Sequence, residues 1–209
     1  MTGAPAPAPG DAPRRRGRPP AGGREAILAA ALRLLRERGI ARVTSREVAA
    51  CAGVSEASVF YHYKHRAGLL RAVFEQGLEP LQALAGELAG ADLHDVLTRY
   101  AHTLDEFLDQ ALPVMAAAQS DSALRDELAA YVTEHDLGPQ RGVAALGDYL
   151  ASEQAAGRVR AGVDPYAAAM LFVGACYTRA AQRQMPGDVS ALPGLESVIG
   201  VTEELLRPA

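Results

Sequence analysis

The sequence predicts an all-α protein on three observations. Apolar residues recur at the three- to four-residue spacing of amphipathic helices along most of the chain. Aromatic residues make up only 5% of the chain, and alanine supplies many of the apolar positions, a composition suited to closely packed helices. Val, Ile, Thr and Tyr never gather into the alternating runs that are typical of strands. The 209 residues are enough for one large or two small domains.

The N-terminal segment, residues 1–22, has the composition of a disordered arm. Its first part is rich in Pro, Ala and Gly and cannot bury a core. A basic run, RRRGRPP, follows and contains Arg14, Arg15, Arg16 and Arg18. RGRP resembles the core of an AT-hook, and extended arginines of this kind can enter the narrow minor groove of A·T-rich DNA. The alternative is a tail that binds phosphates without sequence preference.

Residues 24–38 form the first predicted helix. Ile27, Ala31 and Leu34 share one face, and Gly39 is expected to end the helix. This helix is expected to pack across the next two and to complete a three-helix domain, residues 23–66.

Residues 43–66, VTSREVAACAGVSEASVFYHYKHR, are predicted to form two short helices joined by a tight turn. Thr44 and Ser55 have N-cap chemistry. Glu47 is expected to complete a capping box by reaching back to the Thr44 N–H. Gly53 supplies a left-handed residue between the helices. The predicted helices run from about Ser45 to Cys51 or Ala52 and from Glu56 to His62. With so short a turn they must cross steeply, as in a helix-turn-helix.

This segment resembles the DNA-binding domain of the TetR family of transcriptional regulators. The resemblance runs through TSREVAACAGVSEASVFYHYKHRAGLL, Thr44 to Leu70. Phe60, which is expected to pack inward, stands where a tyrosine is usual, so a hydroxyl bond to phosphate is lost there. His65 and Ala67 replace the commoner polar and acidic residues at the start of the next helix. The alternative is a helical hairpin of another all-α domain.

Candidate DNA contacts lie on the outer face of the second short helix and beside it. Arginine can bond a guanine edge through two hydrogen bonds, and a glutamate can accept from a cytosine amine. The expected base readers are Arg46, Glu56, Ala57, Ser58 and Tyr61. The expected phosphate contacts are Thr44, Ser55, His62, Lys64 and Arg66, and Ser45 is a further DNA-contact candidate. Two alternatives stay open, since Thr44 and Ser55 could serve only as caps and His62 could be a packed histidine.

The charge is divided unevenly along the chain. Residues 1–75 contain thirteen Lys or Arg and six Asp or Glu, whereas the remainder contains eight basic and nineteen acidic residues. A basic first third joined to an acidic remainder suggests that only the first third meets a polyanion.

Residues 67–209 are predicted to form a larger helical domain. A fourth helix opens at Arg66 or Ala67, and Pro80 is expected to kink or break it. This helix is the one obvious rod between the two parts of the chain. Asp92 is expected to cap the next helix, and Pro113 to start another short one. The later helices are expected at residues 123–134, 139–156, 165–184 and 193–206.

The last two long helices carry more apolar residues than one buried side of a helix requires, so each is expected to pack against two neighbours. The resemblance implies that they pair with a second copy into a four-helix dimer interface. The expected interface residues are Ala168, Leu171, Phe172, Ala175, Val198, Val201 and Leu205. The alternative is burial within one subunit.

The resemblance also implies a small-molecule pocket in the acidic helical domain. The expected lining is Tyr100, Phe107, Met115, Tyr131, Tyr149, Phe172 and Tyr177. Each could instead be a core residue. The scattered histidines form no triad or metal cluster, and the two cysteines match no metal spacing. We therefore expect no enzymatic activity, no metal and no cofactor.

These observations and the resemblance together imply a homodimeric repressor that binds a double-stranded DNA operator and is released by a small-molecule effector. An activator role stays open. The rivals are an architectural DNA-binding protein without a ligand and an enzyme housed in the acidic domain. With no visible signal peptide or membrane span, the expected location is the cytoplasm and no membrane partner is expected.

Overall fold

The computed structural model describes residues 23–186, 188 and 190–208. Every regular element in these ranges is helical, as predicted. The predicted arm, residues 1–22 with its four arginines, lies outside the described residues. The helices are α1 (Gly23–Arg38), η1 (Ile40–Arg42, a 3₁₀ turn), α2 (Ser45–Ala52), α3 (Glu56–Tyr63), α4 (Arg66–Ala85), α5 (Leu93–Ala118), α6 (Ser122–Glu134), α7 (Pro139–Ala155), α8 (Pro165–Arg183) and α9 (Leu195–Leu206).

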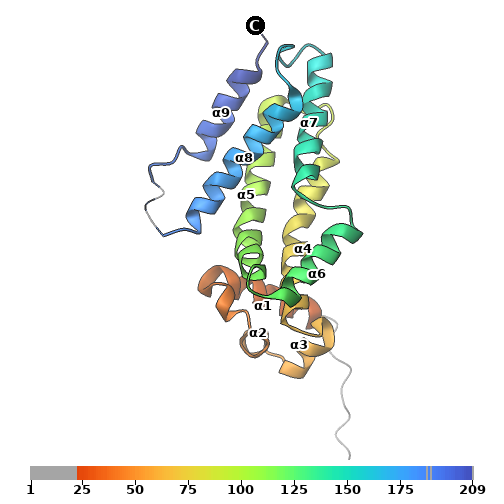
Figure 1. Ribbon diagram of the computed structural model, residues 1–209, viewed down its shortest axis with the longest axis vertical. Coiled ribbons are helices and arrows are strands. Elements are labelled where there is room, and N and C mark those ends of the chain that lie inside the picture. The colour runs from red at the N-terminus through yellow and green to blue at the C-terminus, as the bar shows by residue number, and fades with distance from the viewer. Residues whose placement is uncertain (1–22, 187, 189, 209) are drawn as a thin grey trace, which may run out of the picture.

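The three N-terminal helices, α1 to α3, sit together at one end of an elongated molecule (Figure 1). Helices α4, α5, α7 and α8 run along its length, and α6 lies obliquely beside the lower part of α4. Helix α9 packs against α5 and α8, and the segment before it loops away from the body. In the described ranges, no helix has the length and apolar character that a bilayer span requires.

Side-chain caps set the limits of α2 and α3. The Thr44 hydroxyl accepts a hydrogen bond from the Glu47 N–H at 3.2 Å, and Gly53, with φ of 69°, ends α2. The second half of the expected capping box is absent. The Glu47 carboxylate instead accepts from Arg42 at 3.0 Å, because the Thr44 N–H already bonds to the Arg42 carbonyl at 2.9 Å.

Pro80 and Pro113 both lie inside continuous helices. The expected break at Pro80 and the expected new helix at Pro113 are absent. Helix α4 continues past Pro80 to Ala85, and α5 continues through Pro113 instead of ending before it. Each proline removes one backbone donor. Around Pro113, however, the flanking Leu112 and Val114 are buried, so tertiary packing holds the helix together across the missing hydrogen bond.

The core divides into two clusters that share α4 and α5. The first cluster joins buried residues of α1 to α3 and the first half of α4 to the end of α5 and to α6. The second cluster joins the end of α4 to most of α5 and to α7, α8 and α9. Phe107 and Met115 pack against both clusters. The first half of α4 is thus part of the same core as the helix-turn-helix.

Two glycines let α7 approach its neighbours closely. A Cβ at Gly147 would collide with the ring of Tyr166 on α8. A Cβ at Gly142 would lie 2.9 Å from the Tyr100 hydroxyl of α5, closer than real Cβ contacts come. Glycine at these positions therefore brings α7 near enough to close one side of the bundle.

Candidate nucleic-acid interface and effector cavity

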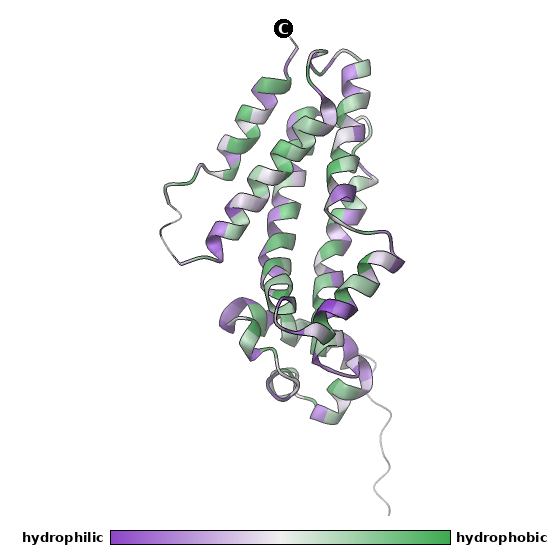
Figure 2. Cartoon of the chain, in the orientation of Figure 1, coloured by the Kyte–Doolittle hydropathy of each residue, from purple (hydrophilic) through white to green (hydrophobic). Residues whose placement is uncertain are grey.

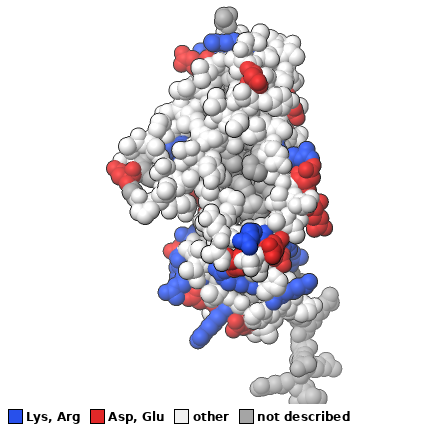
Figure 3. Space-filling view, in the orientation of Figure 1, with Lys and Arg blue, Asp and Glu red and all other residues white. Residues whose placement is uncertain are grey.

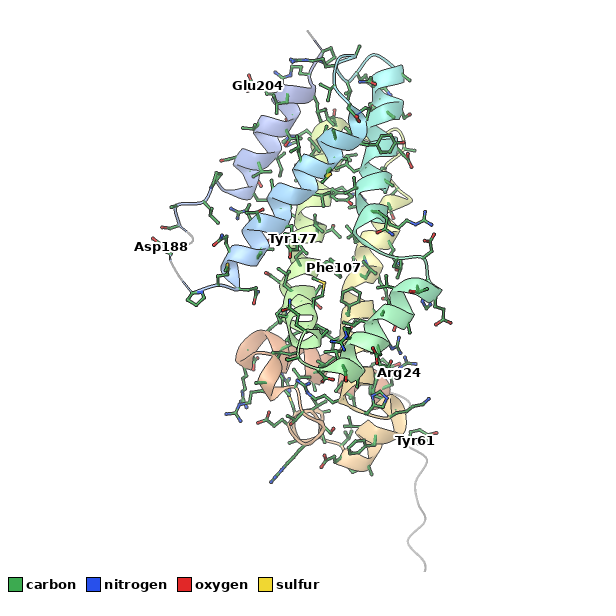
Figure 4. The ribbon with its side chains drawn as sticks, in the orientation of Figure 1. Arg24, Tyr61, Phe107, Tyr177, Asp188 and Glu204 are labelled. Carbon is green, nitrogen blue, oxygen red and sulfur yellow. The ribbon has the colours of Figure 1, made fainter. Side chains whose placement is uncertain are left out.

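Helix α3 presents one face to solvent at the end of the molecule (Figure 4). Tyr61 is 77% exposed, and Glu56 and Ala57 are exposed beside it. Phe60, expected to pack inward, is also 47% exposed. The opposite face buries Val59 and Tyr63 in the first cluster. This amphipathic division leaves planar and short side chains on the outside, as an element that enters a DNA groove requires.

Basic side chains flank this face. Lys and Arg gather around the end formed by α1 to α3, whereas the middle of the face in Figure 3 is largely uncharged. Arg46 on α2 is exposed. Lys64 is exposed at the C-cap of α3, where its φ of 59° is a left-handed conformation that a lysine rarely adopts. That bend turns the chain from α3 into α4 and leaves the ammonium group in solvent.

Arg66 is not available to phosphate as expected. Its guanidinium donates to the carbonyls of Val43 at 2.9 Å and Ile40 at 3.1 Å, and it lies 3.5 Å from the Asp121 carboxylate. The Arg66 guanidinium therefore directs its N–H groups to the turn before α2 and to the N-cap of α6, inside the protein. Arg66 therefore anchors α4 to its neighbours.

The three expected hydroxyl contacts and His62 are partly engaged within the fold. The Ser55 hydroxyl accepts from the Ser58 N–H at 3.1 Å and lies 2.9 Å from the Ser58 hydroxyl. Thr44 and Ser55 therefore both have a structural role as helix caps. Ser45 and His62 are half-buried, and the His62 ring packs edge-on against Tyr61.

A cavity of about 300 Å³ lies between α4, α5, the end of α6, the start of α7 and α8. Phe107 and Tyr177, labelled in Figure 4, approach it from α5 and α8. Its lining consists of Phe74, Leu78, Leu81, Gln82, Ala85, Tyr100, Leu104, Phe107, Leu108, Met115, Val132, Leu137, Gly138, Arg141, Gly142, Val173 and Tyr177. The cavity thus lies where the two core clusters meet, since Phe74 belongs to the first and Tyr100 to the second. This is the cavity whose absence would have favoured an architectural protein without a ligand.

Four of the expected lining residues reach this cavity, namely Tyr100, Phe107, Met115 and Tyr177. Three do not. Tyr131 is buried in the first cluster beneath Arg71, Tyr149 is buried with its hydroxyl donating to the Ala91 carbonyl at 2.9 Å, and Phe172 is buried in the second cluster. They are core residues, which was the alternative for each.

The whole contribution of α4 to the cavity was missed by sequence analysis. Phe74, Leu78, Leu81, Gln82 and Ala85 recur at spacings of three and four and so share one face of a helix. The expectation that Pro80 interrupts this helix hid that continuous stripe. The spacing of these residues could have predicted that this face of α4 lines a cavity or a core.

The polar groups at the cavity are few, and the deepest of them is already bonded. The Tyr100 hydroxyl donates to the Gly142 carbonyl at 2.8 Å, and burial raises the pKa of Tyr100, so the phenol stays neutral. Arg141, at the rim, is exposed, and its guanidinium pairs with the Asp136 carboxylate and donates through Nε to the Asp136 carbonyl at 3.1 Å.

Helices α8 and α9 expose large apolar side chains. Leu171 is 74% exposed, and Val201 and Leu205 are each 60% exposed. Figure 2 shows hydrophobic residues along much of α9. Ala168, Ala175 and Val198 are half-buried, whereas Phe172 faces the core of its own subunit and does not belong to this surface. Ala168 and Val198 also pack against the second cluster. The apolar α8–α9 surface therefore consists of the exposed Leu171, Val201 and Leu205 with the half-buried Ala175.

The cysteines and acidic residues offer no metal site in the part of the chain that the structure describes. Cys51 is half-buried, with its sulfur 2.6 Å from an Arg33 nitrogen. Cys176 is buried in the second cluster, and burial raises the pKa of its thiol to about 11. Cys176 is therefore a protonated core residue at neutral pH.

Comparison with protein families gives two matches that together span most of the chain. Residues 27–73 match the model for bacterial regulatory proteins of the tetR family. Residues 91–196 match the model for the C-terminal domain of AefR-like transcriptional repressors.

Individual proteins agree with these matches. An uncharacterized HTH-type transcriptional regulator, YvkB of Bacillus subtilis, is 29% identical over 136 residues, which is 65% of this chain and 70% of YvkB. A tetR-family regulator from Rhodococcus sp. is 25% identical, with a TM-score of 0.60 over 87% of this chain and 95% of its own. A complex of SmeT with triclosan has a TM-score of 0.65 at 20% identity, over 89% of this chain and 92% of its own.

Proposed function

Because this chain belongs to the TetR family of transcriptional regulators and has that family's DNA-binding domain, we propose that it is a homodimeric repressor released from its operator by a small molecule. Residues 23–66 would carry DNA recognition, and residues 67–209 effector binding and dimerisation. The arm at residues 1–22 would add contacts to the duplex.

The observation that carries this proposal is the position of α4. The first half of α4 packs in the same cluster as the helix-turn-helix, and its second half lines the cavity through Leu78, Leu81 and Gln82. A molecule that fills the cavity would therefore press on the helix that holds the DNA-binding end. Core packing is close and resists gradual deformation, so such pressure favours a shift of α4 as a unit.

Two copies are needed for this shift to matter. In a dimer, the two α3 helices would enter successive major grooves about 34–36 Å apart. A tilt of α4 in each subunit would change that spacing. Effector binding releases the operator only if the effector binds the two spacings unequally, which is the thermodynamic requirement for any such switch. The exposed apolar α8–α9 surface supports dimerisation, since a patch of this kind on a soluble protein marks an interaction site.

The direct test of the DNA-binding face is Tyr61→Ala. We expect this variant to lose at least about fivefold in operator affinity, because a good side-chain contact with a base edge contributes about 1–3 kcal/mol. Operator DNA can be obtained by mapping the protected sequence around the protein's own gene, and affinity measured by mobility-shift titration. Tyr61→Phe separates the hydroxyl from the ring.

Met185→Ala is the control, since Met185 is another large exposed side chain and lies just beyond the end of α8, away from the helix-turn-helix. It should leave DNA affinity unchanged. If Tyr61→Ala binds the operator as tightly as the unaltered protein, α3 does not enter the groove and the proposed interface is wrong.

A further inference from the structure

The walls of the cavity point to the chemistry of its occupant. Resting on the proposed function, we propose that the effector is an uncharged, mainly apolar molecule, and that the site discriminates against anions such as carboxylates, sulfonates and phosphates. The proposal concerns the ligand class and follows from the side chains that meet at the cavity.

The wall is built almost entirely from aliphatic and aromatic groups. Phe74 and Phe107 meet edge to face, with ring centroids 5.4 Å apart, and Tyr100 adds the side of a third ring. Leucine, valine and methionine side chains from α4, α5, α6 and α8 close the gaps between them. Such a surface gains from contact with apolar atoms and offers a charged group nothing to replace its lost water.

The deep polar atoms of the wall are unavailable for a charge. The Tyr100 hydroxyl already donates its hydrogen bond to the Gly142 carbonyl. Among the described residues that line the cavity there is no Asp, Glu, Lys or His, and Arg141 is the sole charged one. A buried ion needs a partner of opposite charge, so a cation and an anion would both be penalised here.

Among the described residues of the lining, Arg141 is the only cationic one, and its surroundings argue against recruitment of an anion. Its guanidinium pairs with the Asp136 carboxylate and bonds to the Asp136 carbonyl, so its charge is already compensated. It also stands exposed at the rim, in contact with solvent. Gln82 and Tyr177, two exposed residues that also line the cavity, can offer a neutral polar atom of the ligand a hydrogen bond.

The volume limits the size of the occupant. About 300 Å³ is at the lower end of ligand sites, which typically enclose about 300–1,000 Å³. A molecule of two or three linked rings fits this space, whereas a nucleotide-linked acyl group does not.

Two fluorescent probes that share one skeleton test the proposal on the full-length dimer. N-phenyl-1-naphthylamine is neutral, and 8-anilinonaphthalene-1-sulfonate is the same skeleton with one sulfonate. We expect the neutral probe to bind at least about tenfold more tightly than the sulfonate, because the sulfonate must leave water without a partner. Affinities are measured by fluorescence titration at fixed ionic strength.

Variants at the cavity locate the binding and separate charge from size. Leu78→Trp should abolish binding of the neutral probe by filling the space, while Leu93→Trp, at a half-buried leucine on α5 outside the cavity, should not. Gln82→Arg places a cation at the cavity and should strengthen sulfonate binding at least about fivefold with little effect on the neutral probe. If the sulfonate were excluded by size alone, Gln82→Arg would not help it.

Equal or tighter binding of the sulfonate by the unaltered protein would overturn the proposal, and so would failure of the neutral probe to bind or its insensitivity to Leu78→Trp. Operator binding in the absence of probes tests the proposed function separately. A protein that binds the neutral probe in the cavity but no operator would leave this inference standing and remove the proposed function.

Discussion

The DNA-binding end and the body of the molecule are held in different ways. At the DNA-binding end, α2 and α3 have only eight residues each, and each begins at a side-chain cap within three residues of its bonding partner. In the body, α5, α6 and α8 also begin at side-chain caps, but these helices are longer and contacts between distant residues join them. Arg183 on α8 donates to Asp105 at 2.9 Å and Asp109 at 2.7 Å on α5. Local chemistry therefore sets the limits of α2 and α3, whereas the position of α3 relative to a second copy in the proposed dimer would depend on long-range packing.

The largest expected effect comes from a substitution on the body that disrupts dimerisation and leaves the DNA-binding end intact. Leu205→Glu puts a charge on the apolar α8–α9 surface. We expect the dissociation constant of the proposed dimer to rise by at least about a hundredfold, because burying an unpaired carboxylate is costly. Operator affinity should fall with it. Sedimentation velocity and mobility shift measure the two losses.

Met185 provides a matched control for this charge. It is as exposed as Leu205, at 60%, but lies just beyond the end of α8 and outside the α8–α9 surface. Met185→Glu should leave the dimer intact. If Leu205→Glu remains dimeric, another surface holds the subunits together.

The second prediction separates the anchor of α4 from a phosphate contact. Arg66→Ala should lower the free energy of unfolding by about 2 kcal/mol, because it removes a charged donor from the Val43 carbonyl and leaves the Ile40 carbonyl with only the Val43 N–H. Lys64→Ala should leave stability nearly unchanged and weaken DNA binding several-fold, with a smaller salt dependence. Chemical denaturation and salt titrations distinguish the two. The opposite pattern would return Arg66 to the DNA contacts.

A smaller loss is expected at the cap of α2. Thr44→Ala should lower the free energy of unfolding by about 1 kcal/mol, the usual effect of losing a hydroxyl cap. Ser45→Ala, at the adjacent hydroxyl, should change it by less than about 0.5 kcal/mol. Equal effects in thermal unfolding would show that the Thr44 cap has no special role.

The smallest effect is a pH-dependent one in the body. Hydrogen bonds from Arg158 at 2.6 Å and 2.8 Å hold the pKa of Glu153 below its usual value of 4.5. Folding thus favours the ionised carboxylate, and its stabilisation is complete above pH 4.5 and lost as the pH falls through the lowered pKa.

Glu153→Gln should therefore lower stability at neutral pH by less than about 1 kcal/mol, since Arg158 is largely exposed. The difference from the unaltered protein should vanish in acid. Glu204→Gln, at an exposed glutamate on α9, should show no such pH dependence. A difference for Glu153→Gln that persists in strong acid would mean that packing, and not the ion pair, is responsible.

The same contrast explains what could be predicted from the sequence. The ends of α2 and α3 were predicted to within one residue, because Thr44, Gly53 and Ser55 act on their immediate neighbours. The prolines misled in the body, where burial of residues such as Leu112 and Val114 outweighs one missing hydrogen bond.

The candidate site divides along the same line. Exposure of Tyr61 and Glu56 follows from the apolar pattern of a short helix. The roles of Arg66, Tyr131 and Phe172 do not, because each depends on which face of a helix meets a partner far along the chain. Helical spacing shows that the aromatic residues face inward. Only the three-dimensional arrangement shows which of them line the cavity and which belong to a core.

Helix α4 has a consequence for protein engineering. Its first half is buried with the helix-turn-helix, and its second half lines the cavity of the body. A hybrid that grafts the operator specificity of another regulator onto this sensor cannot be joined at the loop before α4 without mismatching half of one core. A junction inside the helix, after Phe74 and near Gly77, would keep the α1 to α4 part of the first cluster together, but its contacts with the end of α5 and with α6 would still have to match.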